Sequence, residues 1–112
     1  MMFGIATSII VQRLIQLVND QAGHAVVVQR GDPTGGILLV LWEHPEGVNL
    51  FQPERVMETN GITWRLAKEN LTDEEARRWV AQYASFDGDA WVVSLEGHGS
   101  EDAMTFLREL VA

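Results

Sequence analysis

The chain has 112 residues, of which 46% are hydrophobic, and this is the length and composition of one globular domain. It has no cysteine, which excludes disulfides and thiolate metal sites and fits a reducing compartment. Its formal net charge of −8 at pH 7 repels phosphate groups, which argues against nucleic acids and anionic membranes as partners. We therefore expect a single cytoplasmic domain over residues 1–112.

The first predicted element is a helix that begins at Thr7 or Ser8, either of which can serve as the N-cap. Arg13 interrupts the apolar start of the chain, and polar residues follow too early for a membrane span. Gly23 is expected to end the helix in the left-handed conformation. Its broad apolar stripe predicts burial between layers or against a second copy and is formed by Ile10, Val11, Leu14, Ile15, Leu17 and Val18.

Two apolar runs follow, HAVVVQR and ILLVLWE, and neither alternates with polar residues. This pattern is typical of strands covered on both faces, so we expect both to be central. The intervening GDPTGG contains turn-forming proline and glycine, which predicts a hairpin over residues 24–43. A third strand over VNLF should end at Pro53, and the alternation from Ile62 to Leu66 predicts a half-buried fourth strand.

The second helix has the clearest start signal, because Thr72 and Glu75 form the pattern of a capping box. An FDGD linker then leads to WVVSLE, the predicted fifth strand, and Ser100 is expected to cap a final helix. The predicted order is α-β-β-β-β-α-β-α. We expect an α+β fold with a five-stranded, largely antiparallel sheet and helices on both faces.

Two segments carry a resemblance to a known family: AGHAVVVQRGDPTGGILLVL and, fifty residues later, YASFDGDAWVVSLE. They resemble the bacterial family named domain of unknown function 1491, whose members show an Arg-Gly-Asp step into a hairpin and an aromatic-Asp-x-Asp-x-Trp-Val-Val step into a late strand. The chain departs from the family where QRLIQL is less basic and where Gly88 replaces a common proline. The resemblance implies a bacterial protein and this fold, but no reaction.

The sequence contains fragments of several catalytic and binding motifs, but none is complete. GDPTGG lacks the ending of a phosphate-binding loop, and His24, His44 and His98 have no metal-binding spacing, even with Glu43 or Glu96 added. His98 and Ser100 do not form a nucleophile elbow. We therefore predict no catalytic residue, no metal site and no cofactor.

One cluster remains as a candidate structural or binding site: Arg30, Asp32, Asp87, Asp89 and Trp91. Asp87 and Asp89 follow the C-terminus of the second predicted helix, where the helix dipole is negative and carboxylates need a nearby cation or hydrogen-bond donor. We therefore expect the guanidinium of Arg30 to contact Asp87 or Asp89.

The leading hypothesis for the function is a non-enzymatic protein-interaction module that self-associates, with Ile10 or Val11 near the interface. The alternative is a small-ligand-binding protein or an enzyme with a site around Arg30, Asp32, Asp87 and Asp89. A solvent-filled pocket around these four residues would favour the alternative.

Overall fold

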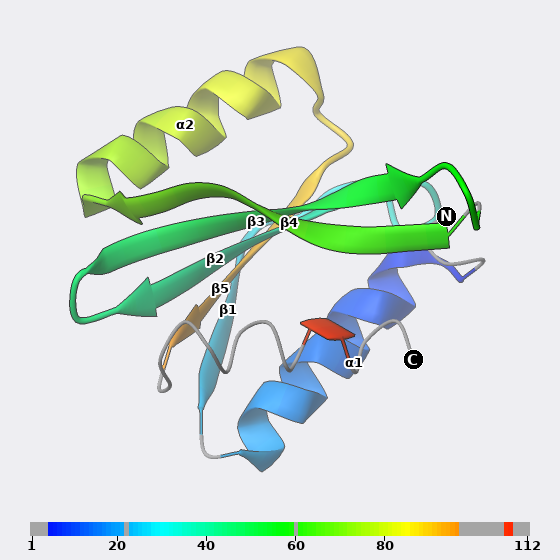
Figure 1. Cartoon of the computed structure of the whole chain (residues 1–112), viewed down its shortest axis with the longest axis horizontal. Coiled ribbons are helices and arrows are strands. Elements are labelled where there is room, and N and C mark those ends of the chain that lie inside the picture. The colour runs from blue at the N-terminus through cyan, green and yellow to red at the C-terminus, as the bar shows by residue number, and fades with distance from the viewer. Residues whose placement is uncertain (1–4, 22, 60, 97–106, 109–112) are drawn as a thin grey trace.

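The computed structural model describes residues 5–21, 23–59, 61–96 and 107–108. Its elements follow the predicted order (Figure 1) and are α1 (Thr7–Asp20), β1 (His24–Gln29), β2 (Leu38–His44), β3 (Gly47–Val56), β4 (Gly61–Leu71), α2 (Asp73–Phe86) and β5 (Trp91–Glu96). The final helix predicted from Ser100 lies outside the described residues, except for Leu107 and Arg108, which are helical. No helix in the described ranges is long and apolar enough to cross a membrane.

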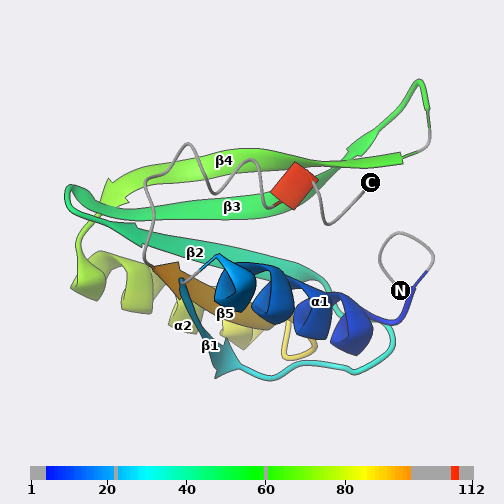
Figure 2. The same ribbon diagram turned by 90° about the horizontal axis from the view of Figure 1, so that it is seen from below.

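The strands form one mixed sheet in the order β1-β5-β2-β3-β4, which can be followed in Figure 2. β5 runs parallel to β2, and the other neighbouring pairs are antiparallel. The predicted α+β class is therefore confirmed, with a sheet that is mixed and not purely antiparallel.

The predicted hairpin over residues 24–43 is wrong, because β5 lies between β1 and β2. β1 is consequently an edge strand, whereas β2 is central as expected. The GDPTGG loop joins the two strands across the start of β5: the backbone N–H of Asp32 donates to the carbonyl of Asp89 at 3.0 Å, and that of Trp91 donates to Ile37 at 2.8 Å. Turn chemistry alone could not reveal that a strand from much later in the chain would enter this gap.

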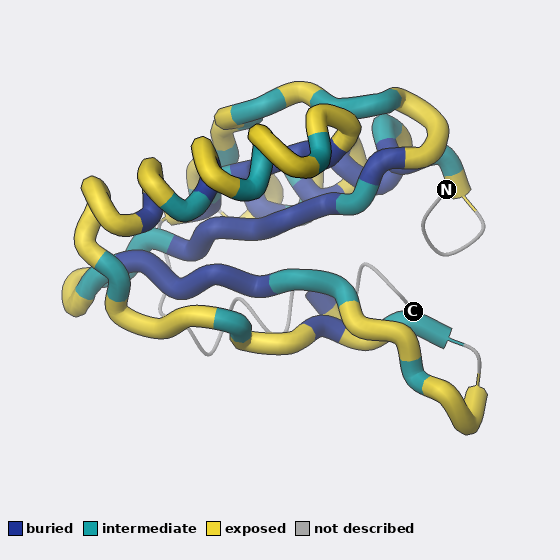
Figure 3. The backbone as a smooth tube through the Cα atoms, turned by 90° about the horizontal axis from the view of Figure 1, so that it is seen from above, coloured by how far each residue is buried: buried dark blue, intermediate teal, exposed yellow. Residues whose placement is uncertain are grey.

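Helices cover both faces of the sheet, as predicted, with α1 and α2 on opposite sides in Figure 1. The strand residues facing α1 include Val40, Trp42 and Val93, while those facing α2 include Leu39, Leu41 and Val92. The central strands are buried almost throughout, as the dark blue tube in Figure 3 shows. β2 thus has apolar side chains on both faces because each face has its own core.

The N-terminus of α1 is capped by the backbone of the GDPTGG loop and not by a side chain. The N–H groups of Thr7 and Ser8 donate to the carbonyls of Thr34 and Pro33, at 3.3 and 2.9 Å. Thr7 is the first residue of α1 and is buried, and its hydroxyl donates to the carbonyl of Gly36 at 2.5 Å. The prediction of Thr7 or Ser8 as N-cap is therefore wrong, because backbone carbonyls from the loop already satisfy these donors.

The broad apolar stripe of α1 packs into the core. Ile10 and Val11 are each only 3% exposed and belong to the cluster that covers the sheet. They are therefore not surface residues, and the expected dimer interface at these positions is wrong.

The C-terminal end of α1 is close to the expected position, but Gly23 is not left-handed. Among the described residues, positive φ occurs at Gly47 and Asn70. The helix ends at Asp20, and a Cβ at Gly23 would lie 2.8 Å from Cγ1 of Val18. Gly23 is thus needed for close packing and not for its backbone freedom.

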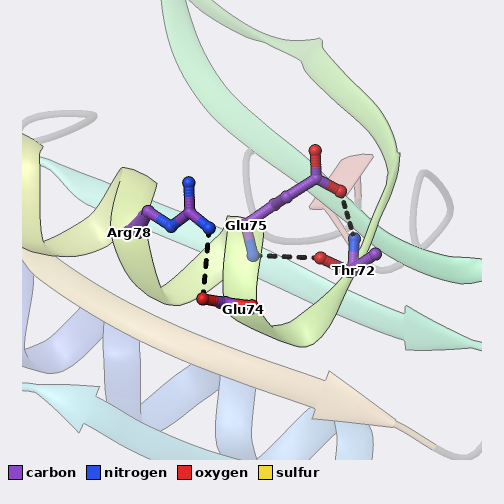
Figure 4. Close-up of polar contacts among 4 residues, drawn as sticks. All are labelled: Thr72, Glu74, Glu75 and Arg78. Carbon is purple, nitrogen blue, oxygen red and sulfur yellow. Dashed lines mark hydrogen bonds and ion pairs between the residues drawn. The ribbon is translucent and has the colours of Figure 1, made fainter.

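The start of α2 has the predicted capping box (Figure 4). The Thr72 hydroxyl accepts from the N–H of Glu75 at 3.1 Å, and a Glu75 carboxylate oxygen accepts from the N–H of Thr72 at 2.9 Å. This backbone hydrogen bond lowers the pKa of Glu75. Glu74 and Arg78 form an exposed ion pair of 3.1 Å one turn apart.

β3 continues past Pro53 to Val56, so the predicted strand end is too early. β3 pairs with β2 from Gly47 to Phe51 and with β4 from Val48 to Val56, so from Gln52 onward β4 is its strand neighbour in the described structure. Pro53 therefore lies where β3 has a strand on one side, a position that tolerates a missing N–H donor.

Candidate functional site

The two segments singled out in the sequence lie side by side, joined by their backbones. Besides the bond from Asp32 to Asp89, the indole N–H of Trp91 donates to the carbonyl of Asp32 at 2.8 Å. The side-chain amide of Gln29 donates to the carbonyl of Ala90 at 2.9 Å. We name this contact between residues 29–36 and 87–91 the loop clasp.

The aspartates of the loop clasp accept hydrogen bonds within their own loops. A carboxylate oxygen of Asp32 accepts from the N–H of Thr34 at 3.1 Å, and one of Asp87 accepts from the N–H of Asp89 at 3.0 Å. Both bonds span two residues, which is the geometry of an Asx turn. The carboxylates therefore shape the loops in this structure.

Arg30 lies over the indole of Trp91, with its guanidinium carbon 5.5 Å from the ring centroid. This is the distance of a cation–π contact. The ion pairs among the described residues are Arg65–Glu54 and Arg78–Glu74, so the expected pair between Arg30 and Asp87 or Asp89 is not formed. The prediction was right that Arg30 contacts the segment around residues 87–91, but the side chain it contacts is Trp91 and not an aspartate.

Arg30, Asp32, Asp87 and Asp89 line neither of the two cavities found among the described residues. One cavity lies under α2, and a second, smaller one of about 260 Å³ lies against its C-terminal half. In the described residues, the arrangement is a direct contact between two loops.

The larger cavity has a volume of about 440 Å³ and lies between α2 and the β1 side of the sheet. We name it the α2–β1 cavity. Its lining residues are Val28, Gln29, Leu41, Glu43, Val48, Asp73, Ala76, Arg77, Val80, Ala81 and Ser94.

Strand alternation brings polar side chains to this cavity. Leu41 is paired with Ser94 across the parallel β2–β5 contact, and both line the cavity. Two residues further on, Glu43 of β2 and Glu96 of β5 face the same side, because side chains alternate with a period of two. The two strands thus place a pair of carboxyl groups at the edge of the α2 core.

The carboxyl group of Glu43 is electrostatically unusual. Partial burial raises its pKa, and so do a hydrogen bond with Glu96 and the negative charges of Glu96 and Asp73, whereas a hydrogen bond with Ser94 lowers it. The Glu43 carboxyl group therefore keeps its proton more readily than an isolated glutamate does.

The histidines are dispersed. His44 Nε2 lies 2.9 Å from Oδ1 of Asn49, a buried oxygen that also accepts from the N–H of Asn70 at 3.0 Å. His24 is at the opposite end of β1 from the loop clasp, and His98 lies outside the described residues. No group of three or more metal-ligating residues occurs in the described part of the chain.

Sequence reasoning weighed Glu43 and Glu96 only as companions of histidine, and it overlooked Ser94, Asp73 and Arg77. The available signal was the appearance of Glu43, Ser94 and Glu96 at alternate positions of strands that are otherwise apolar. Pairing these positions requires the parallel register of β2 and β5, which local sequence does not contain.

Solved structures that are similar to this chain include the following three. Protein Atu0922 from A. tumefaciens has 21% identity and a TM-score of 0.76, with 90% of this chain and 92% of that chain covered. A crystal structure of a DUF1491 family protein from Caulobacter crescentus CB15 has 25% identity and a TM-score of 0.75, covering 83% and 88%. An NMR structure of a DUF1491 family protein from the same organism has 24% identity and a TM-score of 0.75, covering 92% of both chains.

A search of the curated proteins gives no match. The family model described as "Protein of unknown function (DUF1491)" matches residues 5–105, which is nearly the whole chain. This protein is therefore a member of the DUF1491 family.

Proposed function

We propose that this protein is a non-enzymatic protein-interaction domain and that its interface is the free edge of β1. The observation that carries the proposal is a valine-rich, half-exposed edge strand that has a neighbouring strand on one side only among the described residues. In the described part of the chain β1 pairs with β5 alone, so the backbone donors and acceptors on its other side are open to another strand.

The two edges of the sheet differ in chemistry. β4 carries the exposed charged residues Arg65, Lys68 and Glu69, which discourage pairing with another sheet. β1, with the sequence HAVVVQ, has no lysine, arginine, carboxylate or proline. The pairing of β1 with β5 shifts register between Val27 and Gln29, so the regularly paired stretch of β1 consists of four residues, His24 to Val27. That stretch has little of the protection usual at an edge.

The exposed side chains of β1 support the same surface. Val26 and Val28 are 47% and 50% exposed, and they lie on the sheet face that α2 only partly covers, since α2 packs on β3 and β4. β-Branched residues on an open edge favour pairing with a further strand, whose own side chains would cover them.

The partner that fits this edge most simply is a second copy of the chain. An antiparallel β1–β1 pair is self-complementary about a two-fold axis. Although the chain has a net charge of −8, β1 itself has no acidic residue to repel its copy. The overall charge further supports a protein partner over a nucleic acid or an anionic membrane, and we place this interaction in the cytoplasm.

Light scattering over a range of protein concentrations tests the proposal. We expect the mass to rise toward that of a dimer, and we expect Val26→Lys to shift the equilibrium to the monomer. Leu66→Lys is the matched control, because Leu66 is 43% exposed on the opposite edge strand. A chain that remains monomeric at high micromolar concentration, or one in which both variants weaken association equally, would contradict the β1 interface.

A further inference from the structure

We propose that the α2–β1 cavity binds a small organic cation, namely a protonated amine that carries an apolar tail. The proposal rests on the shape and chemistry of the cavity and is independent of the β1 interface.

The size and walls of the cavity suit a small molecule. Its volume of about 440 Å³ lies within the range of roughly 300–1,000 Å³ that is typical of ligand pockets. Leu41 and Val48 of the sheet and Ala76 and Val80 of α2 line it, and all four are buried members of the α2 core cluster. Val28 adds an apolar rim on the β1 side. An alkyl or aryl tail would therefore meet apolar surface on several sides.

The polar end of the cavity presents acceptors. Glu43, Asp73 and Ser94 line it, and Glu96 follows Ser94 on the same face of β5. A protonated amine offers up to three N–H donors and a positive charge. It can therefore pair with the carboxylates of Glu43 and Asp73, which both line the cavity.

Other charged groups face the same region. Arg77 of α2 lines the cavity, and His24 of β1 is opposite Glu96 in the antiparallel β1–β5 pair. The charges that act on Glu43 are nevertheless those of Glu96 and Asp73. The Glu43 end is thus acidic, which favours an amine over a carboxylate ligand.

A set of three matched probes tests this assignment by NMR titration of the ¹⁵N-labelled protein at pH 7: 4-phenylbutylamine, 4-phenylbutanol and 4-phenylbutyrate. These compounds share a phenylbutyl tail and differ in the charge of the head. We expect the amine to shift the amides of Val28, Ser94 and Ala76 and to bind at least about tenfold more tightly than the alcohol, the equivalent of one charge-assisted contact. Equal binding of amine and alcohol, or preferred binding of the butyrate, would overturn the proposal.

Two variants locate the site. Glu43→Gln should lower the amine affinity about tenfold or more, since the amide removes the charge and keeps the shape. Glu58→Gln, at the exposed turn after β3, removes the same charge elsewhere and should leave binding unchanged. Ala81→Trp fills the cavity from the exposed side of its wall and should abolish binding while the protein remains folded. Amine binding that survives both Glu43→Gln and Ala81→Trp in folded protein would show that the cavity is not the site.

Discussion

The indole N–H of Trp91 donates a hydrogen bond of 2.8 Å to the backbone carbonyl of Asp32, across 59 residues of sequence. The same indole ring lies under the guanidinium of Arg30. Trp91 is also buried in the core between the sheet and α1. One side chain thus connects the β1–β2 loop to the first residue of β5 and to the α1 core.

Replacing Trp91 with phenylalanine should lower the free energy of unfolding by about 1–3 kcal/mol, because the variant loses this hydrogen bond and some packing volume. Urea unfolding measures the loss. Arg30→Ala removes only the cation–π contact and should cost about 0.5–1 kcal/mol. An Arg30→Ala loss as large as that of Trp91→Phe would mean that the charge, and not the indole hydrogen bond, dominates the loop clasp.

Two glycines provide a matched test of the close approach between the loops. A Cβ at Gly36 would overlap the carbonyl oxygen of Asp89, whereas a Cβ at Gly88 meets no atom within 4 Å. Gly36→Ala should therefore destabilise the protein by several kcal/mol, about 3 or more, because backbone must move. Gly88→Ala should be neutral or stabilise by up to about 1 kcal/mol through the unfolded chain. Melting temperatures compare the two, and similar values for both variants would contradict the loop contact.

Neighbouring valines on β1 distinguish its two faces. Val27 packs against the core cluster on the α1 side, while Val26 is half-exposed on the other face. Val27→Asp should cost about 2 kcal/mol or more by placing a carboxylate against apolar side chains, and Val26→Asp should change the unfolding free energy by less than about 0.5 kcal/mol. Denaturant unfolding of the two variants at a concentration that favours the monomer provides the measurement. The reverse order would mean that the register of β1 is shifted by one residue.

Glu43→Gln should stabilise the protein increasingly as the pH rises. The pKa of Glu43 in the folded protein is raised above its ordinary value of 4.5. Below 4.5 the group is protonated in both the folded and unfolded states, so its contribution to stability is fully present. As the pH rises through the raised pKa this contribution is lost, because ionisation is easier in the unfolded chain.

Glutamine does not ionise, so the melting temperature of Glu43→Gln relative to the parent protein should be higher at pH 7 than at pH 4. Glu58→Gln controls for the removal of one negative charge from an acidic chain. A difference between parent and Glu43→Gln that does not change between these pH values, or that falls with rising pH, would refute the raised pKa.

Local sequence chemistry was sufficient for the elements themselves. The Thr72–Glu75 box marks the start of α2 because both partners lie within one helical turn. The apolar run ILLVLWE marks β2 because its side chains face a core on either side.

The predictions failed where a strand or helix end contacts a segment that is distant in the sequence. HAVVVQ has the composition of a central strand, yet Val26 and Val28 are half-exposed. The composition of a strand does not determine whether it has a neighbouring strand on one side or on both. Likewise, Thr7 has a side chain suited to an N-cap, but the carbonyls of Pro33 and Thr34 accept the hydrogen bonds of the first helical N–H groups. The Glu43–Glu96 pair depends on a parallel register between strands that are far apart in the chain, and no local pattern encodes it.

The position of β5 also determines the order in which the chain can assemble during synthesis. β2, β3 and β4 are consecutive and antiparallel, so they can pair after closing short loops. β1 is made before them, but its strand partner in the described structure is made last of the five. A growing chain therefore emerges from the ribosome with β1 unpaired and its valines uncovered until Trp91–Glu96 arrives. The insertion of β5, with its long loop closures, is the step expected to limit the rate of folding, and the interval before it is when a chaperone would meet this strand.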